Sequence, residues 1–248
     1  PALTDLAGSP IVNPDARFIQ WRLRLSGVDG ARARLSHVTV SYAPYNRSPA
    51  IEDFRLHPPA TAISETATFR WSVSDADGDA VEVSHDYSPS GSDDWAVALP
   101  ESSDPVTPGG DGGVWRAGEG SWDTSAVPEG SYVARAVCND RIANHPGDGR
   151  ETRSAPLMSV IVDRSPPQIR ADEAGGSIRV EVTDEHSPVP RLEVVPDGTG
   201  AFRGRPADGV CDSTQERFEI ARRALDLSGA IVLRAFDSAG NSVEWPLP

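Results

Sequence analysis

The sequence predicts an all-β protein built from tandem β-sandwiches. Apolar and polar residues alternate with a period of two in many short segments, which is the pattern of half-buried strands. Clusters of Gly, Pro, Ser and Asp separate these segments at short intervals, as they do in sandwiches. The best helical candidate, Gln215–Leu227, alternates like a strand at Phe218 and Ile220, so at most one turn of helix is expected, at Ala221–Leu225.

The first pair of strands is expected near the N-terminus. Phe18–Leu25 (FIQWRLRL) and Leu35–Tyr42 (LSHVTVSY) both alternate, and the segment between them turns at Gly27 and Gly30. Together they predict a β-hairpin. Two strands cannot bury a core alone, so residues 1–48 must complete a sandwich or barrel, or pack on the next domain.

A second group of strands follows the break at Tyr45–Pro49 (YNRSP). The expected strands are Ala67–Val73, Ala80–Asp86, Trp95–Leu99, Ser131–Asn139 and Ala155–Val162. The stretch Pro100–Gly120 is rich in Gly, Pro, Ser and Asp and is interpreted as a long loop. Residues 49–167 hold about the number of strand candidates that one sandwich needs.

A third group begins after Arg164–Pro167 (RSPP), because two consecutive prolines interrupt a sheet ladder and favour an extended linker. The expected strands are Ser177–Thr183, Arg191–Val195, Arg217–Ala221, Ala230–Asp237 and Ser242–Trp245. Residues 168–248 therefore form a second, smaller sandwich.

The charged residues exclude several classes of function. All 23 basic residues are Arg, and the 37 acidic residues give a net charge of −14. Without Lys there is no Schiff-base nucleophile and no Walker phosphate loop. The acidic balance argues against nucleic-acid binding, which needs a basic face. No run of 18 apolar residues occurs, so no membrane-spanning segment is expected.

Three sets of motifs resemble the C-terminal region of large secreted bacterial proteins that carry a β-propeller. ARFIQWRLRLSG and LSHVTVSYAPYNRSPAI resemble a junction where a jelly-roll-like unit ends in a hairpin. FRWSVSDADGDAVEVS, SWDTSAVPEGSYVARAVCND and VDRSPP resemble a fibronectin type III-like domain. RPADGVCDSTQERFEI and LRAFDSAGN resemble a closing immunoglobulin-like domain. The resemblance implies a secreted or cell-surface location and a non-catalytic role, and it supplies no active-site residues.

Asp75, Asp77 and Asp79 (DADGD) form the densest acidic cluster. Alternating carboxylates supply the oxygen ligands that calcium prefers, so calcium is the one expected cofactor. The match to a calcium loop is partial, because Ala80 occupies the position where an EF-hand needs Gly and a strand follows in place of a helix. A tight turn, in which Asp and Gly tolerate left-handed geometry, is the alternative interpretation.

The long loop carries a second, weaker candidate site. Asp93 and Asp94, with Trp95 and Trp115 nearby, are a candidate glycan-binding set, since exposed Trp faces stack on sugar rings and carboxylates bond hydroxyls. The alternative is that both Trp residues belong to the core beside a solvated loop.

Other conspicuous residues are assigned to structure. Trp71 and Trp122 are expected in the core, and Tyr132, after Pro128–Gly130, is expected to form a tyrosine corner. Cys138 and Cys211 match no metal or redox spacing, so they are free thiols or a bridge between domains. The five histidines show no metal spacing. Asp184–His186 carries no nucleophile motif, so no catalysis is expected.

The sequence therefore predicts a non-catalytic structural or interaction module of a bacterial surface protein, serving as spacer, adhesion or assembly domain. A carbohydrate-binding module, or an accessory domain of a secreted enzyme, is the alternative. The expected partners are other domains of the same polypeptide or a surface assembly that pairs with an exposed strand edge, and glycans under the alternative.

Overall fold

The computed structural model describes residues 20–22, 24, 30, 34–40, 45–100, 116–155, 158–196, 200–221 and 229–247. The chain divides into two compact units, Pro1–Asn46 and Arg47–Pro248. All sixteen strands of the described residues lie in the second unit, and the described residues contain no helix, which confirms the all-β prediction. The hairpin predicted for Phe18–Leu25 and Leu35–Tyr42 lies largely outside the described residues.

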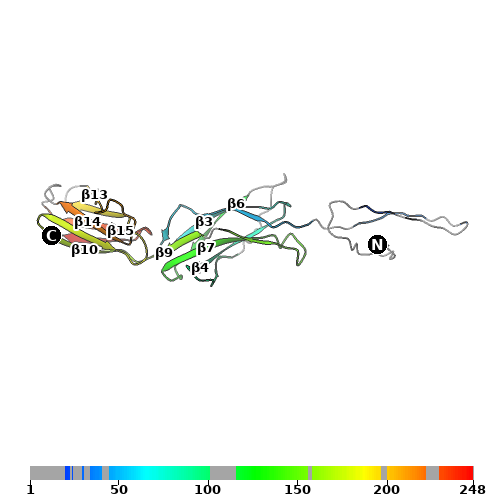
Figure 1. Ribbon diagram of the computed structural model, residues 1–248, viewed down its shortest axis with the longest axis horizontal. Helices are drawn as coiled ribbons and strands as arrows, with labels where there is room; N and C mark the ends of the chain where they lie inside the picture. Colours follow the sequence, from blue (N-terminus) through cyan, green and yellow to red (C-terminus); the bar gives the residue numbers. More distant parts are fainter. Residues whose placement is uncertain are drawn as a thin grey trace. The chain divides into compact units, whose positions relative to one another are not determined.

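The first sandwich follows Pro49 directly. Its strands are β1 (Ala50–Leu56), β2 (Ala62–Ile63), β3 (Thr66–Ser74), β4 (Glu82–Pro89), β5 (Ala96–Leu99), β6 (Arg116–Asp123), β7 (Gly130–Asn139), β8 (Glu151–Arg153) and β9 (Met158–Val162). One sheet has the order β1-β3-β6, and the other has the order β2-β9-β7-β4-β5, with β8 on β7 (Figure 1). All pairs are antiparallel except β2 with β9.

The second sandwich begins right after the RSPP linker. Its strands are β10 (Gln168–Ala174), β11 (Ser177–Thr183), β12 (Arg191–Pro196), β13 (Phe202–Arg203), β14 (Gln215–Ala221), β15 (Ile231–Phe236) and β16 (Ser242–Leu247). The sheets β10-β11-β14 and β13-β12-β15-β16 are both antiparallel (Figure 1). Strand β11 has the bounds that the alternation predicts.

The two sandwiches share one topology. When the short strands β2 and β8 are set aside, the described residues of each sandwich form seven strands. The first, second and fifth form one sheet, and the other four form the second. Strand β3 therefore corresponds to β11, and β7 corresponds to β15. This correspondence matters for the sites below, because acidic residues follow the same strands in both.

Each sandwich has its own apolar core, as the alternation along the strands requires. In the first, Phe69 is fully buried and stacks at 5.9 Å on Trp122, while Trp71 packs in an adjoining cluster. Trp71 and Trp122 are thus core residues, as predicted. In the second, Leu192, Leu233 and the neighbouring Val and Ile side chains are fully buried between the sheets.

The prediction of a loop over Pro100–Gly120 is wrong at its C-terminal end, because strand β6 begins at Arg116. The sequence there, RAGEGSWD, lacks apolar alternation, since glycines occupy two of its positions. Gly118 lies opposite Trp71 in the register of β3 and β6. A Cβ atom at Gly118 would sit 2.2 Å from Cζ2 of Trp71, so the strand needs glycine where the indole ring covers it.

The tyrosine corner is confirmed. The Tyr132 hydroxyl donates a hydrogen bond of 2.8 Å to the Pro128 carbonyl, and the ring is 6% exposed. We expect Tyr132→Phe to lower the free energy of unfolding of the first sandwich by about 1 kcal/mol, because one largely buried hydrogen bond is lost. Urea denaturation followed by tryptophan fluorescence measures this, since Trp71, Trp95 and Trp122 all lie in or beside this sandwich.

The matched control is Tyr87→Phe. Tyr87 belongs to the same aromatic cluster, with its ring 5.8 Å from that of Tyr132. We expect this control to change stability by less than about 0.5 kcal/mol. Equal effects of the two changes would contradict the structural role of the Tyr132 hydroxyl.

Both cysteines are free thiols, so the bridge between domains is excluded. Cys138 is fully buried, and burial raises the pKa of its thiol to about 12, which makes it unreactive. Within the part of the chain that the structure describes, no helix is long and apolar enough to cross a membrane.

Candidate functional site

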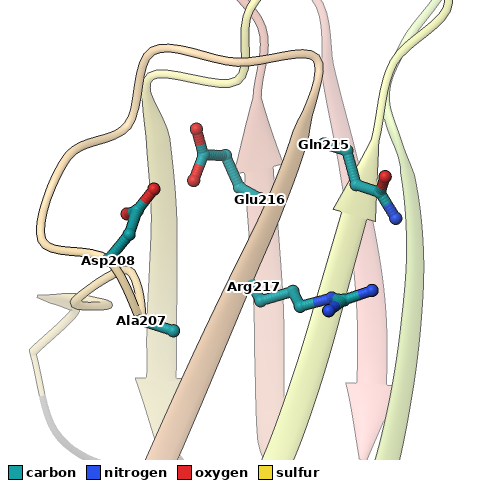
Figure 2. Close-up of a pocket in the computed structure, with 5 residues that line it drawn as sticks. All are labelled: Ala207, Asp208, Gln215, Glu216 and Arg217. Atoms are coloured by element: carbon teal, nitrogen blue, oxygen red, sulfur yellow. The ribbon is translucent and has the colours of Figure 1, made fainter.

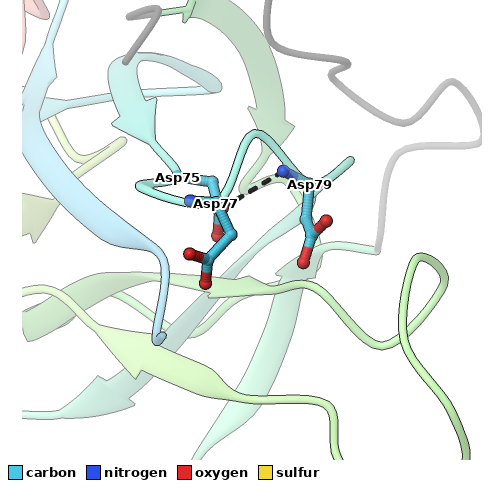
Figure 3. A group of neighbouring side chains, drawn as sticks. All are labelled: Asp75, Asp77 and Asp79. Carbon is cyan, nitrogen blue, oxygen red and sulfur yellow. Dashed lines mark hydrogen bonds between the residues drawn. The ribbon is translucent and has the colours of Figure 1, made fainter. Parts of the chain in front are cut away.

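The DADGD cluster follows strand β3 and begins with a buried aspartate. Asp75 is 1% exposed, and its Oδ1 accepts hydrogen bonds from the amides of Asp77 at 2.8 Å and Asp79 at 3.1 Å (Figure 3). Gly78 has a φ of +81° and donates its amide to the Asp75 carbonyl. These contacts are those of the tight turn that the sequence suggested as an alternative.

The three carboxylates also lie close enough to share a cation. One oxygen from each of Asp75, Asp77 and Asp79 lies within 4.8 Å of the other two. However, Asp77 is already neutralised, because its carboxylate accepts hydrogen bonds from the Arg47 amide at 2.6 Å and from Nε of Arg47 at 2.7 Å. The Arg47 side chain holds the pKa of Asp77 below its usual range. Calcium at this cluster stays a prediction, since the ion has to displace an arginine.

The weaker glycan-binding candidate is only partly described, since Trp115 lies outside the described residues. Asp93 and Asp94 are exposed. Trp95 is partly buried, and the guanidinium of Arg135 lies 3.7 Å from its ring centroid. Arg135 is held there by a salt bridge of 2.9 Å to Asp86. One face of the indole is therefore covered, and glycan binding stays a prediction.

A shallow pocket of about 300 Å³ lies beside strand β14 (Figure 2). Its charged groups are engaged in the fold. Arg217 and Gln215 extend to one side and both bind Oε1 of Glu181, whereas Glu216 extends to the other and accepts the amides of Asp212 and Ser213 (Figure 2). With these bonds made, the pocket presents no convergent set of polar groups for a ligand.

The Asp184–His186 segment also has a structural role. Asp184 Oδ1 accepts the backbone amides of His186 at 2.9 Å and Ser187 at 2.8 Å, so the carboxylate shapes its own loop. It does not orient an imidazole through these bonds, which a catalytic triad would require.

A second acidic cluster was missed by sequence reasoning. It consists of Asp163, Asp184 and Asp237, of which one oxygen each lies within 4.8 Å of the others. These residues are far apart in the sequence, so no local motif marks them. The one available signal is the shared topology. Asp184 follows β11 and Asp237 follows β15, just as Asp75 follows β3 and Asp140 follows β7 in the first sandwich.

Comparisons with known proteins identify no family for this chain. No family model matches it, and no curated protein matches it. In structure it is similar to the crystal structure of chicken CNTN1 FN1–FN3 domains, with a TM-score of 0.35, 12% identity, and coverage of 81% of this chain and 65% of that one. It is also similar to the Salmonella enterica SafA pilin in complex with the SafB chaperone, with a TM-score of 0.23, 10% identity, and coverage of 85% and 98%.

Proposed function

We propose that this chain is a non-catalytic spacer of a secreted or cell-surface bacterial protein, in which two sandwich domains are joined stiffly. The single observation that carries the proposal is the linker Asp163–Pro167, which is hydrogen-bonded on both sides. The location is supported by the sequence resemblance to secreted bacterial proteins. The proposed domains are 49–167 and 168–248, and each has a separate core.

The first sandwich binds the linker through Arg164 and Ser165. The guanidinium of Arg164 donates to the carbonyls of Thr124 at 3.0 Å and Val127 at 2.8 Å. Glu129 accepts both the Arg164 amide and the Ser165 hydroxyl, and this amide holds the pKa of Glu129 below its usual range. The guanidinium and Glu129 thus fix the direction in which the chain leaves strand β9.

The second sandwich binds the start of the same linker, at Asp163. Nδ2 of Asn241 donates to the Asp163 carbonyl at 3.0 Å and to Oδ2 of Asp237 at 2.8 Å. Pro166 and Pro167 restrict the backbone that follows. A linker that is bound on both sides and stiffened by proline transmits position, as a spacer must.

Removing the linker contacts is expected to loosen the junction. Nitroxide labels fit at Val97→Cys and Val210→Cys, since these side chains are 62% and 55% exposed. Cys211→Ser removes the nearby thiol, and Cys138 is buried and can stay. Double electron–electron resonance in chelator-containing buffer should give a narrow distribution of distances between the two labels when the chain carries no other change. The combined change Glu129→Ala and Asn241→Ala should broaden it.

The control is Glu119→Ala, which removes a glutamate of the first sandwich that pairs with Arg70 and is 59% exposed. It should leave the distribution narrow. A distribution that is already broad before the linker contacts are removed would contradict the spacer proposal.

A further inference from the structure

The second acidic cluster lies where the linker meets the second sandwich. Asp163 follows strand β9 and belongs to the linker, Asp184 follows β11, and Asp237 follows β15. One carboxylate oxygen of each lies within 4.8 Å of the other two. Oxygens on opposite sides of one calcium ion are separated by about 4.6–5.2 Å, so these three fit a single coordination shell.

The carboxylates are fixed in orientation by their outer oxygens. Oδ1 of Asp163 accepts the Ser165 amide at 3.1 Å, and Oδ1 of Asp237 accepts the Asn241 amide at 2.8 Å. Asp184 Oδ1 accepts two amides of its own loop. The backbone therefore holds each side chain in place. The second oxygen of Asp237 also accepts Nδ2 of Asn241 at 2.8 Å, whereas the second oxygens of Asp163 and Asp184 are not used by these bonds.

Two of the inner oxygens have no partner. Asp163 is fully buried, and its Oδ2 makes no hydrogen bond with any described residue; the same holds for Oδ2 of Asp184. The Ser187 hydroxyl is also buried without a hydrogen bond of normal geometry, and it lies near enough to the Asp163 carboxylate to lower the pKa of that carboxyl as a donor. Buried polar atoms normally have hydrogen-bond partners, so this group of unpaired oxygens indicates that a binding partner belongs between them.

The charge balance indicates a cation. Burial raises the pKa of Asp163 and of Asp237, and the charge of Asp184 raises both further. Among the described residues, no arginine forms an ion pair with any of the three. The first cluster differs on this point, because Arg47 pairs with Asp77 there. Close, buried carboxylates without a counter-charge repel one another unless a proton or an ion lies between them.

We propose that Asp163, Asp184 and Asp237 bind one calcium ion, which fastens the linker to the second sandwich. Calcium accepts irregular sets of carboxylate, carbonyl and hydroxyl oxygens, which these loops offer, and water completes its shell. The binding site stands by itself, whereas its role in stiffening the junction rests on the proposed function.

The test is calorimetric titration of the chelator-treated full chain with calcium chloride, with melting curves in parallel. We compare Asp184→Asn with Asp77→Asn, which removes the same charge from the first cluster. The unchanged chain should bind calcium and melt at least about 5 °C higher at 100-fold excess over Kd. Asp184→Asn should weaken binding at least tenfold and lose this rise, and Asp77→Asn should keep both.

The melting temperatures of Asp184→Asn and of the unchanged chain in chelator show whether Asp184 acts through ion binding or only through its contacts within the fold. Without calcium, Asp184→Asn should melt at the same temperature as the unchanged chain or higher, because it relieves repulsion while the amide oxygen still accepts the loop amides. No calcium binding by the unchanged chain, or binding that Asp77→Asn abolishes and Asp184→Asn does not, would overturn the proposal. If the calcium proposal fails but the distance distribution between the labels is narrow in chelator, the spacer proposal still holds.

Discussion

Replacing Gly118 by alanine is expected to lower the free energy of unfolding of the first sandwich by about 3 kcal/mol. A methyl group at this position would lie 2.2 Å from Cζ2 and 2.6 Å from Cε2 and Cη2 of Trp71, far inside van der Waals contact. Trp71 is 8% exposed and packs in a core cluster with Val73 and Val83, so displacing its ring disturbs that cluster. Urea denaturation followed by tryptophan fluorescence measures the loss.

Two comparisons make this prediction specific. Gly120→Ala in the same strand should cost less, because its methyl would meet only the Leu99 side chain, with Cδ1 at 2.7 Å and Cγ at 3.9 Å, and that flexible side chain can rotate away. In a Trp71→Leu background, Gly118→Ala should cost much less than in the unchanged chain, since the clashing ring is absent. A full cost in both backgrounds would show that Trp71 does not impose the glycine.

The first sandwich is expected to lose about 3 kcal/mol of stability between pH 6.5 and pH 4 through His85 alone. His85 is 3% exposed, stacks at 5.3 Å on Phe69, and has no hydrogen-bond partner on either ring nitrogen among the described residues. Burial lowers its pKa to about 4. The histidine therefore binds a proton near pH 6.5 in the unfolded chain but only near pH 4 in the folded chain. The free energy of unfolding consequently falls as the pH falls from 6.5 to 4.

His85→Leu isolates this contribution. Leucine has a similar volume and removes the unpartnered nitrogens, so stability at pH 7 should stay equal or rise. The difference between the unchanged chain and the variant should change by about 3 kcal/mol between pH 7 and pH 4. The control is His145→Gln, which replaces an exposed histidine of the same sandwich. A parallel profile for His85→Leu would mean that the imidazole becomes charged within the fold at little cost.

The strands that sequence reasoning found are those with apolar alternation. Strand β11 was predicted to the residue because Ile178, Val180 and Val182 face one way and polar residues face the other. Strand β6 was missed because its inward positions opposite Trp71 and Leu99 are glycines. The hydrophobic side of that contact is supplied by other strands, so the first part of β6 carries no signal of burial, and only Trp122 near its end was expected in the core.

The two acidic clusters show the same limit for sites. Asp75, Asp77 and Asp79 are adjacent in sequence and were easy to find, but the fold supplies Arg47 as their counter-charge. Asp163, Asp184 and Asp237 are brought together only by the topology. Their lack of a counter-charge depends on which side chains surround them, and a sequence pattern does not contain that information.

A spacer requires the two sandwiches to form one stiff unit. Residual dipolar couplings of the backbone amides, measured on the uniformly labelled full chain, test it most directly because they report orientation without added probes. A single alignment tensor should fit the couplings of strands β1–β9 and of strands β10–β16 together. Two tensors that differ in magnitude and rhombicity would show independent motion of the sandwiches and would contradict the claim.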